Sequence, residues 1–212
     1  MLAGAAGAIE AVVELPAAGA RLGTVIVCHP HPEHGGTLHN KVVTMTERGL
    51  RECGLRTLRF NFRGVGASEG THDEGEGESE DVVALAAWVA RTRPQDVLWL
   101  AGFSFGAAVA ARTSLVLPCA QLITVAPPIG KYGFTAERVP TCPWLLVQGE
   151  EDDVVEPAGV YAYAEKLPQP PMIVRVPGAG HFFHRRLMDL RGAIKNGVKG
   201  NLPPLDSAAP LA

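Results

Sequence analysis

Seven short segments of the chain are apolar almost throughout and rich in β-branched or aromatic residues. A strand with one face in water would alternate apolar and polar side chains, whereas these segments suit strands buried on both faces. They cover residues 12–15, 24–28, 57–62, 97–101, 122–125, 144–147 and 172–176. The pattern therefore predicts the strands of a parallel sheet that is covered by helices.

Segments with apolar residues at helical spacing lie between these strands. Four such stripes are Val42, Met45 and Cys53; Val82, Leu85, Ala86 and Val89; Val160, Tyr163, Ala164 and Leu167; and Phe183, Leu187, Leu190 and Ile194. A further helix of small residues is expected at 107–115. From residue 24 onward strands and helices alternate, with an extra strand in front. This order predicts an α/β fold with a doubly wound, mostly parallel sheet of about seven strands flanked by helices.

The length of 212 residues, with 47% hydrophobic and 19% charged residues, fits one sizeable domain. We expect this domain to cover residues 1–199 and to carry no cap domain, because the connection 129–142 is too short for one. Residues 200–212 are small and include prolines, so we expect a disordered tail. The acidic, glycine-rich stretch 73–80 is expected to be a solvated loop rather than a calcium site, with Glu78 to Asp81 favouring a helix N-terminus.

Charge and cysteine content exclude several classes of partner. The net charge is -3 without long runs of one sign, which argues against nucleic acid and anionic membranes as partners. The four cysteines form no C-x-x-C pair, and the apolar residues 1–9 are too short to span a bilayer. We therefore expect a cytoplasmic protein with reduced thiols, and the sequence gives no indication of its oligomeric state.

The pentapeptide Gly102-Phe103-Ser104-Phe105-Gly106 reads G-x-S-x-G between a predicted buried strand and a predicted helix. A serine on so tight a turn has a strained backbone, and side chains at the two glycine positions would collide across the turn. The turn exposes the Ser104 hydroxyl, and the amide of Phe105 points to where an oxyanion would form. The pattern predicts that Ser104 is a catalytic nucleophile.

A serine nucleophile needs a neighbouring imidazole to take its proton. His181 follows Gly178-Ala179-Gly180 directly after the last predicted strand, at the same sheet edge as Ser104. His184 is the nearest competitor, but we place it within the following helix and assign it a structural role. His181 is therefore the predicted general base.

Four acidic residues, 150–153, follow the strand 144–147. The spacing from Gly149 to Val155 favours Asp152 as the carboxylate that orients the histidine, with Asp153 as the alternative. Glu150 and Glu151 are expected to face water.

These three segments, in the order Ser, Asp, His, resemble the α/β-hydrolase superfamily over nearly the whole chain. Residues 60–68, which contain R-G-x-G-x-S, resemble the superfamily's loop after a central strand, and His29-Pro30-His31-Pro32 resembles its oxyanion loop. The sequences of both loops are similar to those of small bacterial hydrolases that lack a lid and are distantly similar to dienelactone hydrolases. The resemblance implies an oxyanion hole. Because Pro30 has no amide hydrogen to donate, we assign the amide of His31 as the second donor of the oxyanion hole, with the amide of Phe105 as the first.

The expected activity is hydrolysis of small carboxylic esters through an acyl-enzyme, with no metal or organic cofactor and a small-molecule ester as the only predicted partner. Acyl transfer or thioester hydrolysis by the same triad and a non-catalytic binding role on the same fold are the alternatives. A zinc site formed by His29, His31, His34 and His39 is a further alternative, although the prolines and glycines of this loop suit a loop that presents backbone amides. His34 or His39 could instead line a substrate pocket or cap the helix that begins near Asn40. Arg63 is expected either to pair within its loop or to bind a substrate carboxylate.

Overall fold

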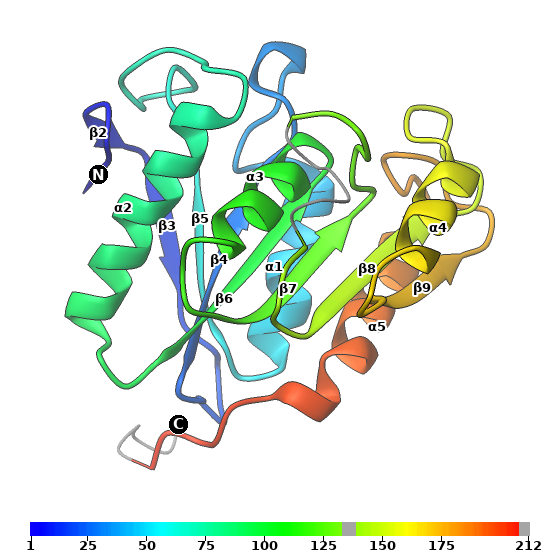
Figure 1. The fold of residues 1–212 in the computed structure, drawn as a ribbon. Helices are drawn as coiled ribbons and strands as arrows, with labels where there is room; N and C mark the ends of the chain where they lie inside the picture. Colours follow the sequence, from blue (N-terminus) through cyan, green and yellow to red (C-terminus); the bar gives the residue numbers. More distant parts are fainter. Residues whose placement is uncertain (133–138, 208–212) are drawn as a thin grey trace.

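The seven apolar segments form one sheet in the computed structural model, which describes residues 1–132 and 139–207. The strand order is β3-β5-β4-β6-β7-β8-β9 (Figure 1). β3 runs antiparallel to β5, and every other neighbouring pair is parallel. The bounds are β3 Ala11–Glu14, β4 Gly23–Cys28, β5 Arg56–Phe60, β6 Val97–Phe103, β7 Cys119–Val125, β8 Trp144–Gly149 and β9 Met172–Val176. The predicted doubly wound, mostly parallel sheet is confirmed.

Helices cover both faces of this sheet. Helices α1 (Lys41–Glu52) and α5 (Leu187–Gly197) pack on one face, and α2 (Glu76–Thr92), α3 (Phe105–Ser114) and α4 (Pro157–Glu165) on the other. Short 3-10 turns occupy Pro32–His34 and Lys199–Asn201. None of the described helices combines the length and hydropathy that crossing a bilayer requires.

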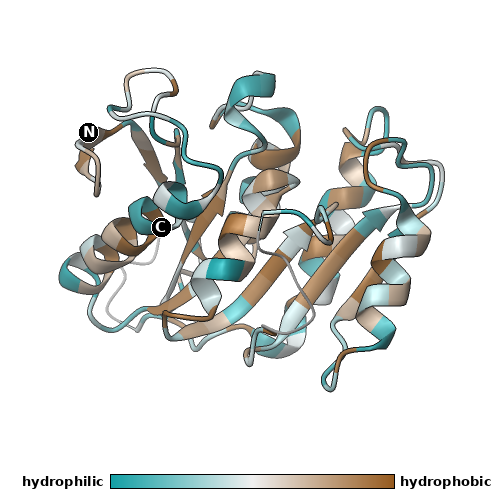
Figure 2. Cartoon of the chain, turned by 45° about the horizontal axis from the view of Figure 1, so that its top comes forward, coloured by the Kyte–Doolittle hydropathy of each residue, from teal (hydrophilic) through white to brown (hydrophobic). Residues whose placement is uncertain are grey.

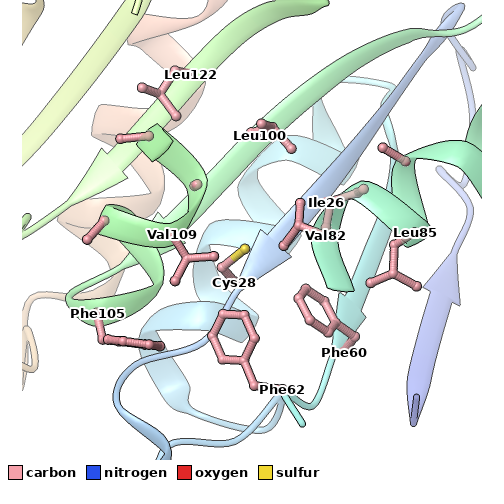
Figure 3. Close-up of a cluster of buried hydrophobic side chains, with 14 of the residues drawn as sticks. Ile26, Cys28, Phe60, Phe62, Val82, Leu85, Leu100, Phe105, Val109 and Leu122 are labelled. Carbon is pink, nitrogen blue, oxygen red and sulfur yellow. The ribbon is translucent and has the colours of Figure 1, made fainter. Parts of the chain in front are cut away.

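The hydrophobic core consists of two layers, one on each side of the sheet. Figure 2 shows that hydrophobic residues, in brown, predominate along the central strands. Successive strand residues point to opposite faces, so Ile26 joins the layer under α2 and α3, whereas Val25 and Val27 join the layer under α1 and α5. All six residues of β4 are buried. Burial of each large apolar side chain contributes about 1.5–3 kcal/mol, which explains why most positions of the central strands are apolar. Figure 3 shows the layer under α2 and α3, with Phe62 and Phe105 at the end nearest the candidate site.

The N-terminus and the acidic stretch differ from expectation. Leu2–Ala3 (β1) and Ala8–Ile9 (β2) form a small antiparallel pair that the sequence pattern did not predict. The stretch 73–80 is a solvated loop only in part, because α2 already begins at Glu76 and Glu78 is fully buried. The Glu78 carboxylate accepts hydrogen bonds from the amides of Gly75 and Asp73, at 2.8 and 3.0 Å. The expected preference of this region for a helix N-terminus is therefore correct, since unpaired N-terminal amides need such an acceptor.

The expectation of a disordered tail is wrong for residues 200–207. Leu205 forms an antiparallel bridge with Arg21, and the Asp206 carboxylate accepts a 2.6 Å hydrogen bond from the buried Arg56 guanidinium. A buried cation needs counterions, and Arg56 obtains two of them, Asp96 and Asp206. Residues 208–212 lie outside the described residues, as does the 133–138 part of the connection 129–142.

Candidate active site

The loops that follow β4, β6, β8 and β9 meet at the carboxyl edge of the sheet. Because these strands are parallel, their carboxyl ends lie side by side. Ser104 follows β6 at the centre of the sheet, Asp152 follows β8, and His181 follows β9. The structure brings all three predicted side chains into one hydrogen-bonded chain.

Ser104 occupies a strained turn between β6 and α3. Its φ of 53° and ψ of −121° are rare for a residue with a side chain and cost about 1–3 kcal/mol. The turn is closed by tight packing: a Cβ on Gly102 would lie 2.1 Å from the carbonyl oxygen of Gly106. The expected collision across the turn is therefore confirmed for Gly102, whereas a Cβ on Gly106 would instead meet the carbonyls of Cys28 and His29. The Ser104 backbone is fixed by a 2.9 Å hydrogen bond from its amide to the Val125 carbonyl of β7.

His181 lies on the loop between β9 and α5 with its imidazole buried. Its Nε2 is 3.1 Å from Ser104 Oγ, which is hydrogen-bonding distance. The ring packs against Phe103, with centroids 5.0 Å apart, and against Phe182 at 5.1 Å. His184 does not lie inside a helix as predicted, because α5 begins only at Leu187; Phe183 and Arg185 have positive φ values that prevent an earlier start.

Asp152 is buried and accepts hydrogen bonds from both sides. His181 Nδ1 lies 2.9 Å from Oδ2 and 3.1 Å from Oδ1, and the amides of Val154 and Val155 donate to Oδ1 at 2.9 and 2.7 Å. Burial alone would raise the pKa of the Asp152 carboxyl, but the hydrogen bonds from His181 and the two amides outweigh it and hold the pKa below its usual value. An ionised Asp152 requires a proton on His181 Nδ1, which leaves Nε2 free to accept from Ser104. Asp153, the alternative carboxylate, is exposed, as are Glu150 and Glu151.

The two amides expected to bind an oxyanion remain available. Phe105 is the first residue of α3, so its amide has no carbonyl in the preceding turn to bond. His31 lies between two prolines beyond β4. Among the backbone hydrogen bonds of the described residues outside helices and strands, none uses the amide of His31 or Phe105 as its donor. The rings of these residues are in contact, with centroids 5.0 Å apart.

Sequence reasoning missed the role of His29, which lies at the end of β4. Its Nε2 accepts a 3.0 Å hydrogen bond from the Phe62 amide, and its Nδ1 lies 2.6 Å from the Pro30 carbonyl. Burial lowers the pKa of His29 to about 4, although the hydrogen bond to Pro30 opposes this effect. The neutral ring with a proton on Nδ1 satisfies both contacts and joins the loops after β4 and β5. Only the unusual His-Pro pair after a buried strand signals this role in the sequence.

Gln148, the fifth residue of β8, is a second residue that sequence reasoning missed. Its side chain is fully buried, and its Nε2 donates a 3.0 Å hydrogen bond to Asp152 Oδ2. A polar residue within an otherwise apolar strand was the available signal. Gln148 positions the carboxylate from the side opposite to the two loop amides.

The other candidate residues are not joined to this chain of hydrogen bonds. Arg63 forms a two-point ion pair with the buried Asp81 of α2, at 2.8 and 3.0 Å. The expected pairing within the loop of Arg63 is therefore wrong as to the partner, which belongs to a helix. The four loop histidines do not converge, because His29 points to Phe62 and His39 is exposed. Helix α1 is capped by Asn40 Oδ1, which accepts from the amide of Val42 at 2.9 Å, and not by His34 or His39.

A pocket of about 570 Å³ lies away from this chemistry. It is lined by the first residues of β6 and β7, including Val97 and Cys119, and by α2. Ser104 lies at the opposite end of β6, roughly 20 Å away for seven residues at the rise of a strand. We therefore locate the candidate active site at the carboxyl edge on chemical grounds.

Comparisons with known proteins give the family. The alpha/beta hydrolase family matches residues 25–141. Uncharacterized protein RP471 of Rickettsia prowazekii is 33% identical over 182 residues, which are 81% of this chain and 76% of that protein. Among solved structures, XC6422 of Xanthomonas campestris, described as an α/β serine hydrolase without lid, is 48% identical with a TM-score of 0.92, covering 97% of this chain and 94% of that chain.

A second solved structure, an alpha-beta serine hydrolase homologue from Coxiella burnetii, is 46% identical with a TM-score of 0.90. The match covers 92% of this chain and 94% of that chain. The sequence therefore did identify the superfamily and the lidless group correctly. The chain belongs to the alpha/beta hydrolase family, as a small hydrolase without a lid.

Proposed function

We propose that Ser104, His181 and Asp152 form a catalytic triad that hydrolyses small carboxylic esters through an acyl-enzyme. The observation that carries the proposal is the continuous chain of hydrogen bonds from Ser104 Oγ through His181 to the buried Asp152. The serine hydrolase descriptions of the relatives that are 46–48% identical support the same reaction type.

In the first half-reaction, Ser104 Oγ attacks the ester carbonyl carbon while His181 Nε2 takes its proton. The carbonyl oxygen becomes an oxyanion and accepts hydrogen bonds from the amides of Phe105 and His31. When the tetrahedral intermediate collapses, the bond to the alcohol oxygen breaks and His181 returns the proton to this leaving group. Asp152 stays ionised throughout and stabilises the imidazolium.

In the second half-reaction, water loses a proton to His181 Nε2 and attacks the acyl-enzyme carbonyl. Collapse breaks the bond to Ser104 Oγ, which takes the proton back, and the carboxylic acid leaves. The chain's own side chains and amides therefore account for every proton transfer in this cycle.

The surroundings of His181 favour small, short-acyl substrates. Phe182 and Val154, next to two triad residues, are 47% and 59% exposed, so this side of the site is an open apolar surface rather than a deep channel. Such a surface buries a short acyl group but gives a long chain few additional contacts. A cytoplasmic location is part of the proposal, supported by four cysteines that are free thiols.

The test is labelling of the purified protein with a fluorophosphonate, read by intact mass. We expect one label on wild type and none on Ser104→Ala, whereas Ser207→Ala, which removes an exposed serine near the C-terminus, should label like wild type. Nitrophenyl esters of increasing acyl length should then be turned over fastest at short chain lengths. An unlabelled, folded wild type would contradict the proposal and favour a binding role, and labelling with acyl transfer to an added alcohol in place of hydrolysis would favour an acyltransferase.

A further inference from the structure

Two histidines and a glutamate from two loops converge beside the candidate active site. His31 follows β4, Glu33 lies in the 3-10 turn Pro32–His34, and His72 lies in the loop before α2. One ligand atom from each of the three lies within 4.8 Å of the other two. The rings of His31 and His72 have centroids 4.9 Å apart. None of the three side chains belongs to the proposed triad.

His72 is held in the form that a metal ion requires. Its Nδ1 lies 2.8 Å from Oε1 of Glu78, and this carboxylate is fully buried and fixed by two backbone amides. Nδ1 therefore carries the proton and donates a hydrogen bond to Glu78, which leaves the lone pair of Nε2 free. A carboxylate behind a ligating histidine is the arrangement that orients the ring and increases its basicity in metal sites.

The free Nε2 of His72 has no other use in the described part of the chain. The atom is buried and makes no hydrogen bond there, because the Glu74 carboxylate oxygen is 3.6 Å away, too far for one. A buried nitrogen without a hydrogen-bond partner is destabilising, and a ligand at Nε2 would remove this penalty. A cavity of about 320 Å³ is lined by Glu33, Arg63 and His72, so it adjoins two of the three side chains.

We propose that His31, Glu33 and His72 bind one divalent transition-metal ion, with zinc as the best match to two imidazoles and a carboxylate. Three protein ligands leave a position for water, or for Glu74, whose carboxylate already lies beside His72. In a tetrahedral zinc shell the ligand atoms are roughly 3.4 Å apart. The three ligand atoms here, which lie within 4.8 Å of one another, must therefore approach each other by about 1.4 Å at most. The exposed side chain of Glu33 can supply this movement.

His31 is also available as a ligand. Its Nδ1 accepts only a long 3.3 Å hydrogen bond from the Glu33 amide, which a metal ion can replace. This site differs from the four-histidine loop site considered from the sequence, since its second imidazole comes from another loop.

The test is titration of the chelator-treated, full-length protein with Zn²⁺ by calorimetry and with Co²⁺ by visible absorption. We expect one saturable equivalent in wild type, at least tenfold weaker binding in His72→Gln, and unchanged binding in His39→Gln, which removes an exposed histidine of the same loop. Glu78→Gln should weaken binding about 10- to 100-fold through the orientation of His72. Circular dichroism melting establishes that each variant is folded.

No saturable one-to-one binding to wild type, or equal affinity in wild type and His72→Gln, would overturn the proposal. His72→Gln carries the test on its own if Glu78→Gln fails to fold, because Glu78 also caps α2. The measurement records binding and not hydrolysis, so its result is independent of the proposed esterase activity.

Discussion

Replacing Asp152 by Asn is expected to lower kcat/KM for ester hydrolysis about 10⁴-fold while leaving the fold intact. The two side chains have nearly the same shape, and the Asn carbonyl oxygen can still accept the amides of Val154 and Val155, which Oδ1 accepts in wild type at 2.9 and 2.7 Å. The Asn amide group then takes the place of Oδ2, opposite His181 Nδ1 and Gln148 Nε2. Two donors already point to that place.

The magnitude follows from the histidine tautomer. With an amide opposite Nδ1, the imidazole is stable only when Nδ1 accepts and Nε2 carries the proton. Nε2 then donates to Ser104 Oγ, 3.1 Å away, and cannot take its proton. The stabilisation of the imidazolium by a carboxylate is lost as well. A factor of 10⁴ corresponds to about 5.4 kcal/mol of lost transition-state stabilisation.

The assay compares steady-state hydrolysis of a short nitrophenyl ester by wild type, Asp152→Asn and Asp153→Asn. Asp153 is the exposed neighbour with the same chemistry, so its variant should stay within about twofold of wild type. Unfolding in urea checks that both variants are as stable as wild type within about 1–2 kcal/mol. An Asp152→Asn variant with more than a tenth of wild-type kcat/KM would refute the assigned role of the carboxylate.

Three further predictions concern stability. His29 has a pKa lowered from 6.5 to about 4, so its contribution of roughly 3 kcal/mol to the free energy of unfolding is complete above pH 6.5 and is lost as the pH falls toward 4. Urea midpoints across this range should fall less in His29→Gln than in wild type, and parallel curves for the two proteins would contradict this. Gly106→Ala should destabilise the protein by about 3 kcal/mol or more, because the new Cβ would lie 2.4 Å from the His29 carbonyl oxygen. Gly192→Ala, with open space around it, should instead stabilise α5 by about 1 kcal/mol, and equal melting temperatures of the two variants would contradict the packing argument. Arg63→Met should cost about 3–5 kcal/mol by leaving the buried Asp81 without its cation, and a loss below 1 kcal/mol in urea would show that the pair is dispensable.

The sheet could be predicted because burial makes most positions of its strands apolar. The same criterion could not find the β1–β2 pair, whose two-residue strands contain too few positions for any periodicity. It also misjudged residues 200–207, where two contacts and not hydrophobicity hold the chain: the bridge of Leu205 to Arg21 and the bond of Asp206 to Arg56. An ion pair of two residues 150 positions apart leaves no local pattern in a sequence.

The geometry at Ser104, His181 and Asp152 could be anticipated because each follows a strand of the parallel sheet and lies at the same sheet edge. The residues that hydrogen-bond to these side chains from behind could not be predicted from the sequence. Gln148 looks like one polar exception within an apolar strand, and nothing in the sequence shows that its amide reaches Asp152. His72 likewise gives no sign that it approaches His31, because the two loops are brought together by the pairing of β4 with β5.

The second glycine of the pentapeptide has a purpose that differs from that of the first. A Cβ on Gly102 would strike the turn itself, at the carbonyl of Gly106, whereas a Cβ on Gly106 would strike the carbonyls of Cys28 and His29 at the end of β4. Gly106 therefore lets the first turn of α3 approach the segment that leads directly to His31. This approach sets the segment of Phe105 beside the segment of His31, with the two rings in contact, and His29 fixes the second segment by its bond to the Phe62 amide. The two proposed oxyanion donors, which belong to loops 74 residues apart in the chain, thus depend on one missing side chain for their relative position.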